Sequence, residues 1–178
     1  SVNQFGEEID QYDQLNPLYV IAELDGQHHG SMRFLPTVGR TMVNEHFTQL
    51  NDGLEIRNPL IWECTRFCIS PFANRAGNVA AMLMLAGAEL GLRFGLRQSV
   101  GVFDARMTRI YKRIGWAPEV LGTEILGSEE TSVGLWQFSE AIKLQLCTKY
   151  RISPRTVEDW FDASFPASEI AEKAVRIA

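Results

Sequence analysis

A long apolar helix pattern between two strand-like runs constrains the fold more than any other feature of the sequence. Residues 78–95 are rich in Ala, Met and Leu, follow a turn-forming loop and stop at Gly95, which predicts a helix. Residues 60–69 and 98–103 carry the β-branched, aromatic and apolar side chains that are typical of buried strands. Two glycines and a glutamate interrupt the apolar part of the helix, which is too short to span a bilayer.

Further predicted elements lie on both sides of this unit. Asp25-Gly26 is a hairpin dipeptide between predicted strands over residues 18–24 and 29–34. Asp104 has the chemistry of an N-cap for a basic helix over residues 105–114 that ends at Gly115. The remaining predictions are a helix-compatible stretch over 41–50, strands over 120–126 and 132–138, and helices over 140–150 and 154–163. This order predicts an α+β fold in a single domain over residues 1–178, with a mixed sheet covered by helices.

Charge is distributed unevenly along the chain, whose formal net charge is −5. Residues 1–32 contain six acidic side chains and no Lys or Arg, whereas residues 93–113 contain six basic side chains and one acidic one. The acidic end favours a cationic small ligand, and the basic helix favours an anionic partner. A net negative chain argues against DNA as that partner.

Cysteine usage indicates a reducing compartment. The three cysteines are Cys64, Cys68 and Cys147, and no histidine lies near them to complete a zinc site. We therefore expect free thiols, a cytoplasmic location and no metal site.

Four sequence patches, taken in order, resemble those of a known family. They are residues 8–13, residues 33–37 with Met42 and Phe47 behind them, residues 62–67, and residues 113–116. In this order and spacing, over about residues 8–138, the chain resembles the acyl-homoserine-lactone synthases of the LuxI type, which make quorum-sensing autoinducers. The resemblance implies a GNAT-like, three-layer fold with a mixed, mostly antiparallel sheet and helices on both faces. It also implies transfer of an acyl chain to the α-amine of S-adenosylmethionine, followed by lactonisation that releases methylthioadenosine.

S-adenosylmethionine carries a sulfonium, an ammonium and a carboxylate, so its pocket needs charges of both signs. Asp10, Asp13, Glu63, Arg33 and Arg66 supply them. The resemblance implies that Glu63 is the general base that takes a proton from the amine.

Two aromatic residues and a strand irregularity complete the predicted substrate site. The resemblance places Phe47 beside the S-adenosylmethionine pocket, and we assign Phe67 to the same pocket, although each alone is typical of a core residue. Side chains alternate along a regular strand, so Glu63 and Arg66 would point to opposite faces. We therefore expect a β-bulge near Cys64 or Thr65.

The basic helix is the predicted docking surface for the acyl donor. Arg109 and Arg113 lie four residues apart and share one helix face, with Arg106 and Lys112 beside them. The resemblance implies that this face binds the acidic acyl carrier protein. An ordinary solvated helix is the alternative. Residues 74–78 do not match the pyrophosphate-binding turn of acetyltransferases, which favours a carrier-bound donor over acyl-CoA.

The acyl chain is predicted to enter a tunnel between the sheet and the long helix. The resemblance places Gly101 where the family has a Thr in members that make 3-oxo products, so we expect an unsubstituted or 3-hydroxy chain. The predicted lining residues are Val100, Gly101, Val102, Phe103, and Met82 with the rest of the long-helix face from Met82 to Leu85.

Several expectations concern the whole protein. The family carries an N-terminal segment that closes over the S-adenosylmethionine site, whereas only Phe5 precedes Glu7 as an aromatic residue here, so we expect this sequence to be part of a longer protein. No prosthetic group, nucleic acid or membrane partner is expected. Two alternatives remain open: a GNAT-type N-acyltransferase that uses acyl-CoA and another amine, and a non-catalytic sensor of S-adenosylmethionine or carrier protein.

Overall fold

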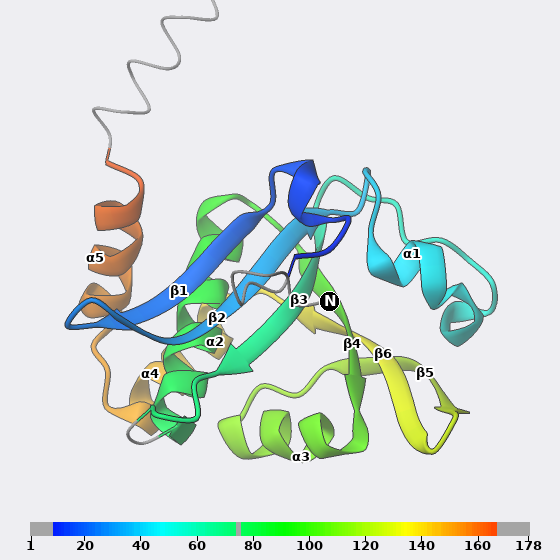
Figure 1. Ribbon diagram of the computed structural model, residues 1–178. Coiled ribbons are helices and arrows are strands. Elements are labelled where there is room, and N and C mark those ends of the chain that lie inside the picture. The colour runs from blue at the N-terminus through cyan, green and yellow to red at the C-terminus, as the bar shows by residue number, and fades with distance from the viewer. Residues whose placement is uncertain (1–8, 74–75, 167–178) are drawn as a thin grey trace, which may run out of the picture.

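A six-stranded sheet forms the centre of the computed structural model (Figure 1), which describes residues 9–73 and 76–166. The strands lie in the order β1-β2-β3-β4-β6-β5. Strands β3 and β4 pair in parallel, and the other four neighbouring pairs are antiparallel. Their bounds are β1 Leu18–Leu24, β2 Gln27–Pro36, β3 Ile61–Ile69, β4 Gln98–Asp104, β5 Glu119–Leu126 and β6 Glu129–Gln137.

Helices cover both faces of this sheet, as the sequence predicts. Figure 1 shows α4 (Glu140–Tyr150) and α5 (Pro154–Ser164) beside α2 (Ala76–Arg93) on one side of the molecule, with α3 (Ala105–Ile114) below the sheet. The opposite face carries α1 (Met42–His46) and the 3-10 turns η1 (Asp13–Leu15) and η2 (Thr48–Asn51). Among the described residues, no helix combines the length and apolarity needed to cross a membrane.

Local chemistry explains the boundaries of the hairpin and of α3. Asp25 and Gly26 have φ angles of 52° and 73°, the left-handed pair that a two-residue hairpin turn requires. The Asp104 carboxylate accepts a hydrogen bond from the backbone N–H of Met107, and Gly115 ends the helix at φ 102°. The predicted turn, N-cap and C-cap are therefore confirmed.

The helix-compatible stretch over residues 41–50 divides into two elements. Helix α1 ends at Phe47, whose φ of −135° lies outside the helical region, and η2 follows. The backbone of Leu50 in η2 packs directly on Gly122 of β5, where a Cβ atom would lie 2.2 Å from the Leu50 carbonyl oxygen. This contact between η2 and β5 needs a glycine and determines the path of the chain after α1.

Strands β3 and β4 separate after a short parallel ladder. Their register runs only from Ile61–Gln98 to Glu63–Val100. Beyond Glu63, β3 continues along β2, while β4 continues along β6. Strands β3 and β4 therefore share no ladder beyond the Glu63–Val100 pair, and we call this divergence in the middle of the sheet the gap.

Candidate active site

Two carboxylates and two guanidinium groups from distant segments meet on the α1 face of the sheet. Arg33 Nη1 lies 2.7 Å from Asp10 Oδ1 and 2.7 Å from Asp13 Oδ1, and Arg66 Nη2 lies 3.1 Å from Asp10 Oδ2. The Arg33 side chain is only 1% exposed, so its charge depends on these partners. The convergence of these four residues, which we call the charge cluster, matches the expectation from the sequence.

Hydrogen bonds tune the acidity of the charge cluster. Burial alone would raise the pKa of Asp13, but bonds from the Tyr19 hydroxyl, the Asp10 backbone N–H and Arg33 outweigh burial and lower the pKa to about 2. Burial would likewise raise the pKa of Asp10, but hydrogen bonds from Arg33 and from the backbone N–H of Tyr12 outweigh burial and lower it. Both carboxylates are therefore anionic at neutral pH and can attract a cationic ligand.

A β-bulge brings Arg66 to the charge cluster. Ser31 pairs with Cys68 and Arg33 pairs with Thr65, so β3 contains one more residue than β2 in this interval. Arg66 has a φ of 51°, which is unusual for a residue with a Cβ atom. The bulge lies at Arg66, slightly beyond its predicted place at Cys64 or Thr65, and it has the expected effect of turning Arg66 toward the Arg33 face.

Glu63 lies on the same strand face but binds backbone rather than a guanidinium group. Its Oε1 accepts from the N–H of Val43 at 2.6 Å, and its Oε2 accepts from the N–H of Met42 at 3.1 Å. Burial raises its pKa, against the opposing effects of these two bonds and the charge of Arg33. Glu63 is therefore a rigid, weakly acidic carboxyl group at the last residue before the gap.

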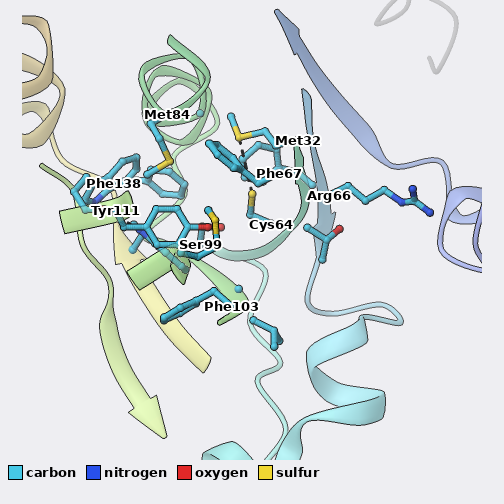
Figure 2. Close-up of a pocket in the computed structure, with 17 residues that line it drawn as sticks. Met32, Cys64, Arg66, Phe67, Met84, Ser99, Phe103, Tyr111 and Phe138 are labelled. Carbon is cyan, nitrogen blue, oxygen red and sulfur yellow. Dashed lines mark hydrogen bonds between the residues drawn. The ribbon is translucent and has the colours of Figure 1, made fainter. Parts of the chain in front are cut away.

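A cavity of about 270 Å³ that is rich in aromatic side chains, which we call the aromatic cavity, lies on the other side of the gap, between the sheet, α2 and α3 (Figure 2). Its aromatic lining residues are Phe34, Phe67, Phe103, Tyr111, Trp116, Trp136 and Phe138. Thr65 and Arg66 also line this cavity. Arg66 belongs to the charge cluster through its bond to Asp10, and Thr65 contacts the cluster because Arg33 Nε donates to Thr65 Oγ1. A polar site and an apolar site therefore meet at the gap between β3 and β4.

The structure corrects part of the predicted acyl tunnel. Gly101, Val102 and Phe103 line the cavity, but Val100 does not, because it is still paired with Glu63 and packs on the α1 face beside Val43. Met82 lines a different cavity, beside β1 and α5. Two residues along a helix correspond to a rotation of about 200°, so Met84 rather than Met82 faces the cavity.

The two assigned phenylalanines lie on opposite faces. Phe47 packs at the end of α1 in the cluster that contains Val43 and Leu50, on the face of the charge cluster. Phe67 lines the aromatic cavity and makes an edge contact with Tyr111, with ring centroids 6.1 Å apart. Its assignment to the S-adenosylmethionine site is therefore corrected: the bulge at Arg66 shifts the alternation of β3 and leaves Phe67 on the cavity side.

The basic side chains of α3 are exposed on the surface. Arg106, Arg109, Lys112 and Arg113 all point to solvent. Among the residues that the structure describes, none of the four forms an ion pair, so their charge is available to an anionic partner. The docking role of α3 stays a prediction.

Sequence reasoning missed Tyr19 and Thr65, which hold the charge cluster from neighbouring strands. The Tyr19 hydroxyl donates to Asp13, and Tyr19 pairs directly with Arg33 across the hairpin. Counting back from the Asp25-Gly26 turn would pair Tyr19 with Met32 instead. A register shift between Ala22 and Glu23 moves the pairing by one residue, so that Tyr19 pairs with Arg33, and no feature of the sequence predicts this shift.

Some predictions lie outside the described residues. These are Glu8 of the acidic patch, the N-terminal aromatic Phe5, and Asn74 and Arg75 of the loop before α2.

Comparison with known proteins gives one consistent family. The family model described as "Autoinducer synthase" matches residues 2–140. The acyl-homoserine-lactone synthase of Rhizobium etli is 37% identical over 135 residues, which cover 72% of this chain and 64% of the relative. The chain thus spans slightly less than two thirds of the length of that relative.

Solved structures extend the likeness to the fold. The CoA-dependent acyl-homoserine lactone synthase MesI superposes with a TM-score of 0.77 at 27% identity, covering 86% of this chain and 78% of MesI. BjaI, a CoA-dependent synthase solved with S-adenosylmethionine and isopentyl-CoA, has the same fold, with a TM-score of 0.76 at 22% identity over 84% of this chain and 72% of BjaI.

Proposed function

The chain belongs to the autoinducer synthase family, and from this membership and its site we propose that it is an acyl-homoserine-lactone synthase. It transfers an acyl chain to the α-amine of S-adenosylmethionine and then closes the lactone. The observation that carries the proposal is the meeting of the charge cluster and the aromatic cavity at the gap between β3 and β4. The substrate has the same division, a charged nucleophile and an apolar acyl chain that must meet at one carbonyl carbon.

The charge cluster supports binding of the charged half of S-adenosylmethionine. Asp10 and Asp13 provide anionic oxygens for the ammonium and sulfonium groups, and the guanidinium of Arg66 is 20% exposed and faces the same place. Arg33 holds the two carboxylates in position, and Thr65 Oγ1 in turn accepts a hydrogen bond from Arg33 Nε. Fixed charges in a partly dry site interact more strongly than charges in water, so the cluster orients the amine toward the gap.

Glu63 is the proposed general base for acyl transfer. Its raised pKa makes it a better proton acceptor than an ordinary glutamate, and its position places it beside the gap. A carboxylate has about four acceptor positions, so two backbone bonds leave room for an amine or a bridging water. Glu63 takes one proton from the ammonium group, and the free amine nitrogen then attacks the thioester carbonyl carbon. The carbon–sulfur bond breaks, and the leaving thiolate takes up the second nitrogen proton to become a thiol.

Lactone closure needs position more than acid or base catalysis. A carboxylate oxygen of the acylated substrate attacks its own γ-carbon, the carbon–sulfur bond breaks, and methylthioadenosine leaves with the electron pair. Sulfonium is a good leaving group, so holding the carboxylate near the γ-carbon is the main requirement.

The acyl donor is proposed to be acyl carrier protein, with acyl-CoA as the second candidate. The exposed cations of α3, which form no ion pair within the described residues, favour an acidic carrier protein. Because the structurally similar MesI is a CoA-dependent synthase, any assay must also include an acyl-CoA donor. The described chain contains free Cys64, Cys68 and Cys147, and we place the protein in the cytoplasm, where thiols stay reduced.

The test is reconstitution of the reaction with defined donors. The protein is incubated with S-adenosylmethionine and either acyl carrier protein or CoA thioesters, and products are identified by mass spectrometry. We expect an N-acyl homoserine lactone and one methylthioadenosine per lactone. S-adenosylhomocysteine, which lacks the sulfonium, is the matched control and gives no lactone.

Other outcomes separate the alternatives. Amide products from unrelated amines, with none from S-adenosylmethionine, would indicate a general N-acyltransferase. Binding of S-adenosylmethionine without turnover of any donor would indicate a sensor.

A further inference from the structure

A free hydroxyl group lies inside the aromatic cavity. Tyr111 projects from α3 into the cavity (Figure 2) and is only 8% exposed. Within the described chain, its hydroxyl has no hydrogen-bond partner. Among the described residues, the only side-chain polar atom that lacks a partner and is also inaccessible to water is Thr41 Oγ1, so the Tyr111 hydroxyl is accessible. The Tyr111 hydroxyl therefore faces open space, and that space is the cavity. A hydroxyl that is open to the cavity can donate a hydrogen bond to a molecule bound there.

The ring of Tyr111 is held in place by its neighbours. Its centroid lies 4.9 Å from that of Trp136, 5.7 Å from Phe103 and 6.1 Å from Phe67, each in an edge contact. Burial raises the pKa of Tyr111, so the hydroxyl keeps its proton and can donate a hydrogen bond. The structure thus presents a preorganised neutral donor rather than a mobile side chain.

Ser99 supplies a complementary acceptor from the sheet. Its hydroxyl lines the same cavity and donates to the backbone oxygen of Trp62 at 3.0 Å, so its proton is used and its lone pairs remain available. A hydroxyl on the ligand can accept from Tyr111 and donate to Ser99. A ketone can only accept, and a methylene leaves both groups unsatisfied.

These polar groups lie near the reacting end of the cavity. Ser99 immediately precedes Val100, which pairs with Glu63 at the start of the gap, and Cys64, the residue after Glu63, lines the same cavity as Tyr111. The thioester carbonyl must sit at the gap, so a substituent close to the carbonyl is the one that meets Tyr111 and Ser99.

From this arrangement we propose that Tyr111 and Ser99 select a 3-hydroxyacyl chain over an unsubstituted or 3-oxo chain of the same length. The inference rests on the proposed synthase function. It assigns the specificity to a residue of α3 and a residue of β4. Gly101 cannot supply the hydrogen bond, because it carries no side chain, and a Cβ there would lie 3.2 Å from the Cys64 carbonyl oxygen and from the Trp136 ring.

The test compares kcat/KM for three donors of equal length: unsubstituted, 3-hydroxy and 3-oxo. For the wild-type protein we expect the 3-hydroxy donor to be preferred over the unsubstituted one by about a hundredfold, the value of two neutral hydrogen bonds. In Tyr111→Phe, which keeps the ring contacts, this ratio should fall about tenfold, because the bond to Ser99 remains, and in Ser99→Ala the preference for 3-hydroxy over 3-oxo should disappear.

Tyr150→Phe is the matched control, because the Tyr150 hydroxyl bonds the Ile114 carbonyl oxygen outside the cavity, and its donor ratio should equal that of the wild type. Lactone formation with an unchanged donor ratio in Tyr111→Phe would overturn the specificity proposal and leave the synthase function intact. Absence of lactone from every donor with the wild-type protein would instead overturn the function on which it rests.

Discussion

Burial disfavours the charge of two residues on neighbouring strands, Arg33 and Glu63, but their partners give opposite outcomes. Arg33 stays charged at 1% exposure because two carboxylates and a threonine satisfy its guanidinium group. Glu63 is equally buried, but its partners are neutral backbone N–H groups, so burial raises its pKa. The same sheet face therefore holds a fixed cation and a carboxyl group that is ready to accept a proton.

Removing the charge of Glu63 should remove the acid limb of the pH profile. In the wild type, kcat/KM should fall as the pH decreases through the raised pKa of Glu63, since only the carboxylate accepts a proton. Glu63→Gln should lose about 10²–10⁴-fold in turnover and show no such limb. Steady-state kinetics between pH 5 and 9 measure both effects.

Glu45→Gln is the control for that experiment. Glu45 lies on α1, next to the backbone N–H groups that bind Glu63, but it accepts from Tyr12 and Arg40, and its variant should keep the acid limb. Full turnover in Glu63→Gln would show that another group removes the proton.

Asp13 should link stability to acidic pH. Its pKa is about 2 in the folded protein, against 3.8 for an unperturbed aspartate, so its stabilising contribution is complete above the higher value and is lost as the pH falls toward the lower one. Asp13→Asn should cost about 1–3 kcal/mol at pH 7 and almost nothing near pH 2. Urea unfolding across this range measures the difference.

The exposed Asp159 of α5 provides the matched comparison. It pairs with Arg155, whose side chain is 73% exposed, and Asp159→Asn should have little effect at either pH. A constant cost of Asp13→Asn from pH 7 to pH 2 would contradict the lowered pKa.

At the scale of elements, α2 combines two glycines with different packing. A Cβ at Gly91 would lie 2.4–2.6 Å from three ring atoms of Phe138, whereas a Cβ at Gly87 would meet first the terminal methyl of Met32, at 2.8 Å. The rigid ring of Phe138 is buried against Trp116, with ring centroids 5.7 Å apart, whereas a flexible methionine tip can adopt another rotamer. Close packing of α2 against the end of β6 therefore depends on Gly91.

Alanine at the two positions should give opposite results. Gly91→Ala should destabilise the protein by about 1–3 kcal/mol through overpacking. Gly87→Ala should be neutral or gain up to about 1 kcal/mol, because alanine is the better helix former. Chemical denaturation measures both, and equal effects would mean that the Phe138 ring yields.

Helix α3 should control the affinity for a carrier-bound donor. Reversing Arg109 and Arg113 to Glu should raise KM for acyl carrier protein about tenfold and remove most of its salt dependence, because exposed charge attraction is screened. Arg97→Glu changes an exposed cation before β4 and should leave KM unchanged. An unaltered KM in the double variant would assign α3 to ordinary solvated surface.

At the scale of the whole molecule, the gap in the sheet joins two different environments. One face holds the charge cluster and η1, and the other holds the aromatic cavity between α2 and α3. Segments from residue 10 to residue 138 contribute to these sites, so substrate binding should stabilise the fold as a unit.

S-adenosylmethionine at 100 times its Kd should raise Tm by about 5–10 °C for a chain of this size. Asp10→Asn should reduce that increase, because it removes an anion from the charge cluster. Thermal unfolding with and without ligand measures the change, and methylthioadenosine, which lacks the amino-acid group and the sulfonium, is the matched ligand. Equal shifts from the two ligands would contradict the role of the charge cluster.

Local signals in the sequence determined most elements of this protein. The Asp25-Gly26 turn, the Asp104 cap and the apolar run of α2 depend on neighbouring residues alone, so each could be predicted. The charged residues of the site could be named, and Arg66 required a bulge to join the others.

Only the tertiary structure decided which side chains share a face. The Tyr19–Arg33 pair depends on a one-residue shift in the hairpin, and the exclusion of Val100 from the cavity depends on where β3 leaves β4. Likewise, Met82 and Met84 look equivalent in the sequence, but only the placement of α2 turns Met84 toward the cavity. The physical reason is that strand register and helix rotation are set by long-range packing, and a shift of one residue moves a side chain to the other face.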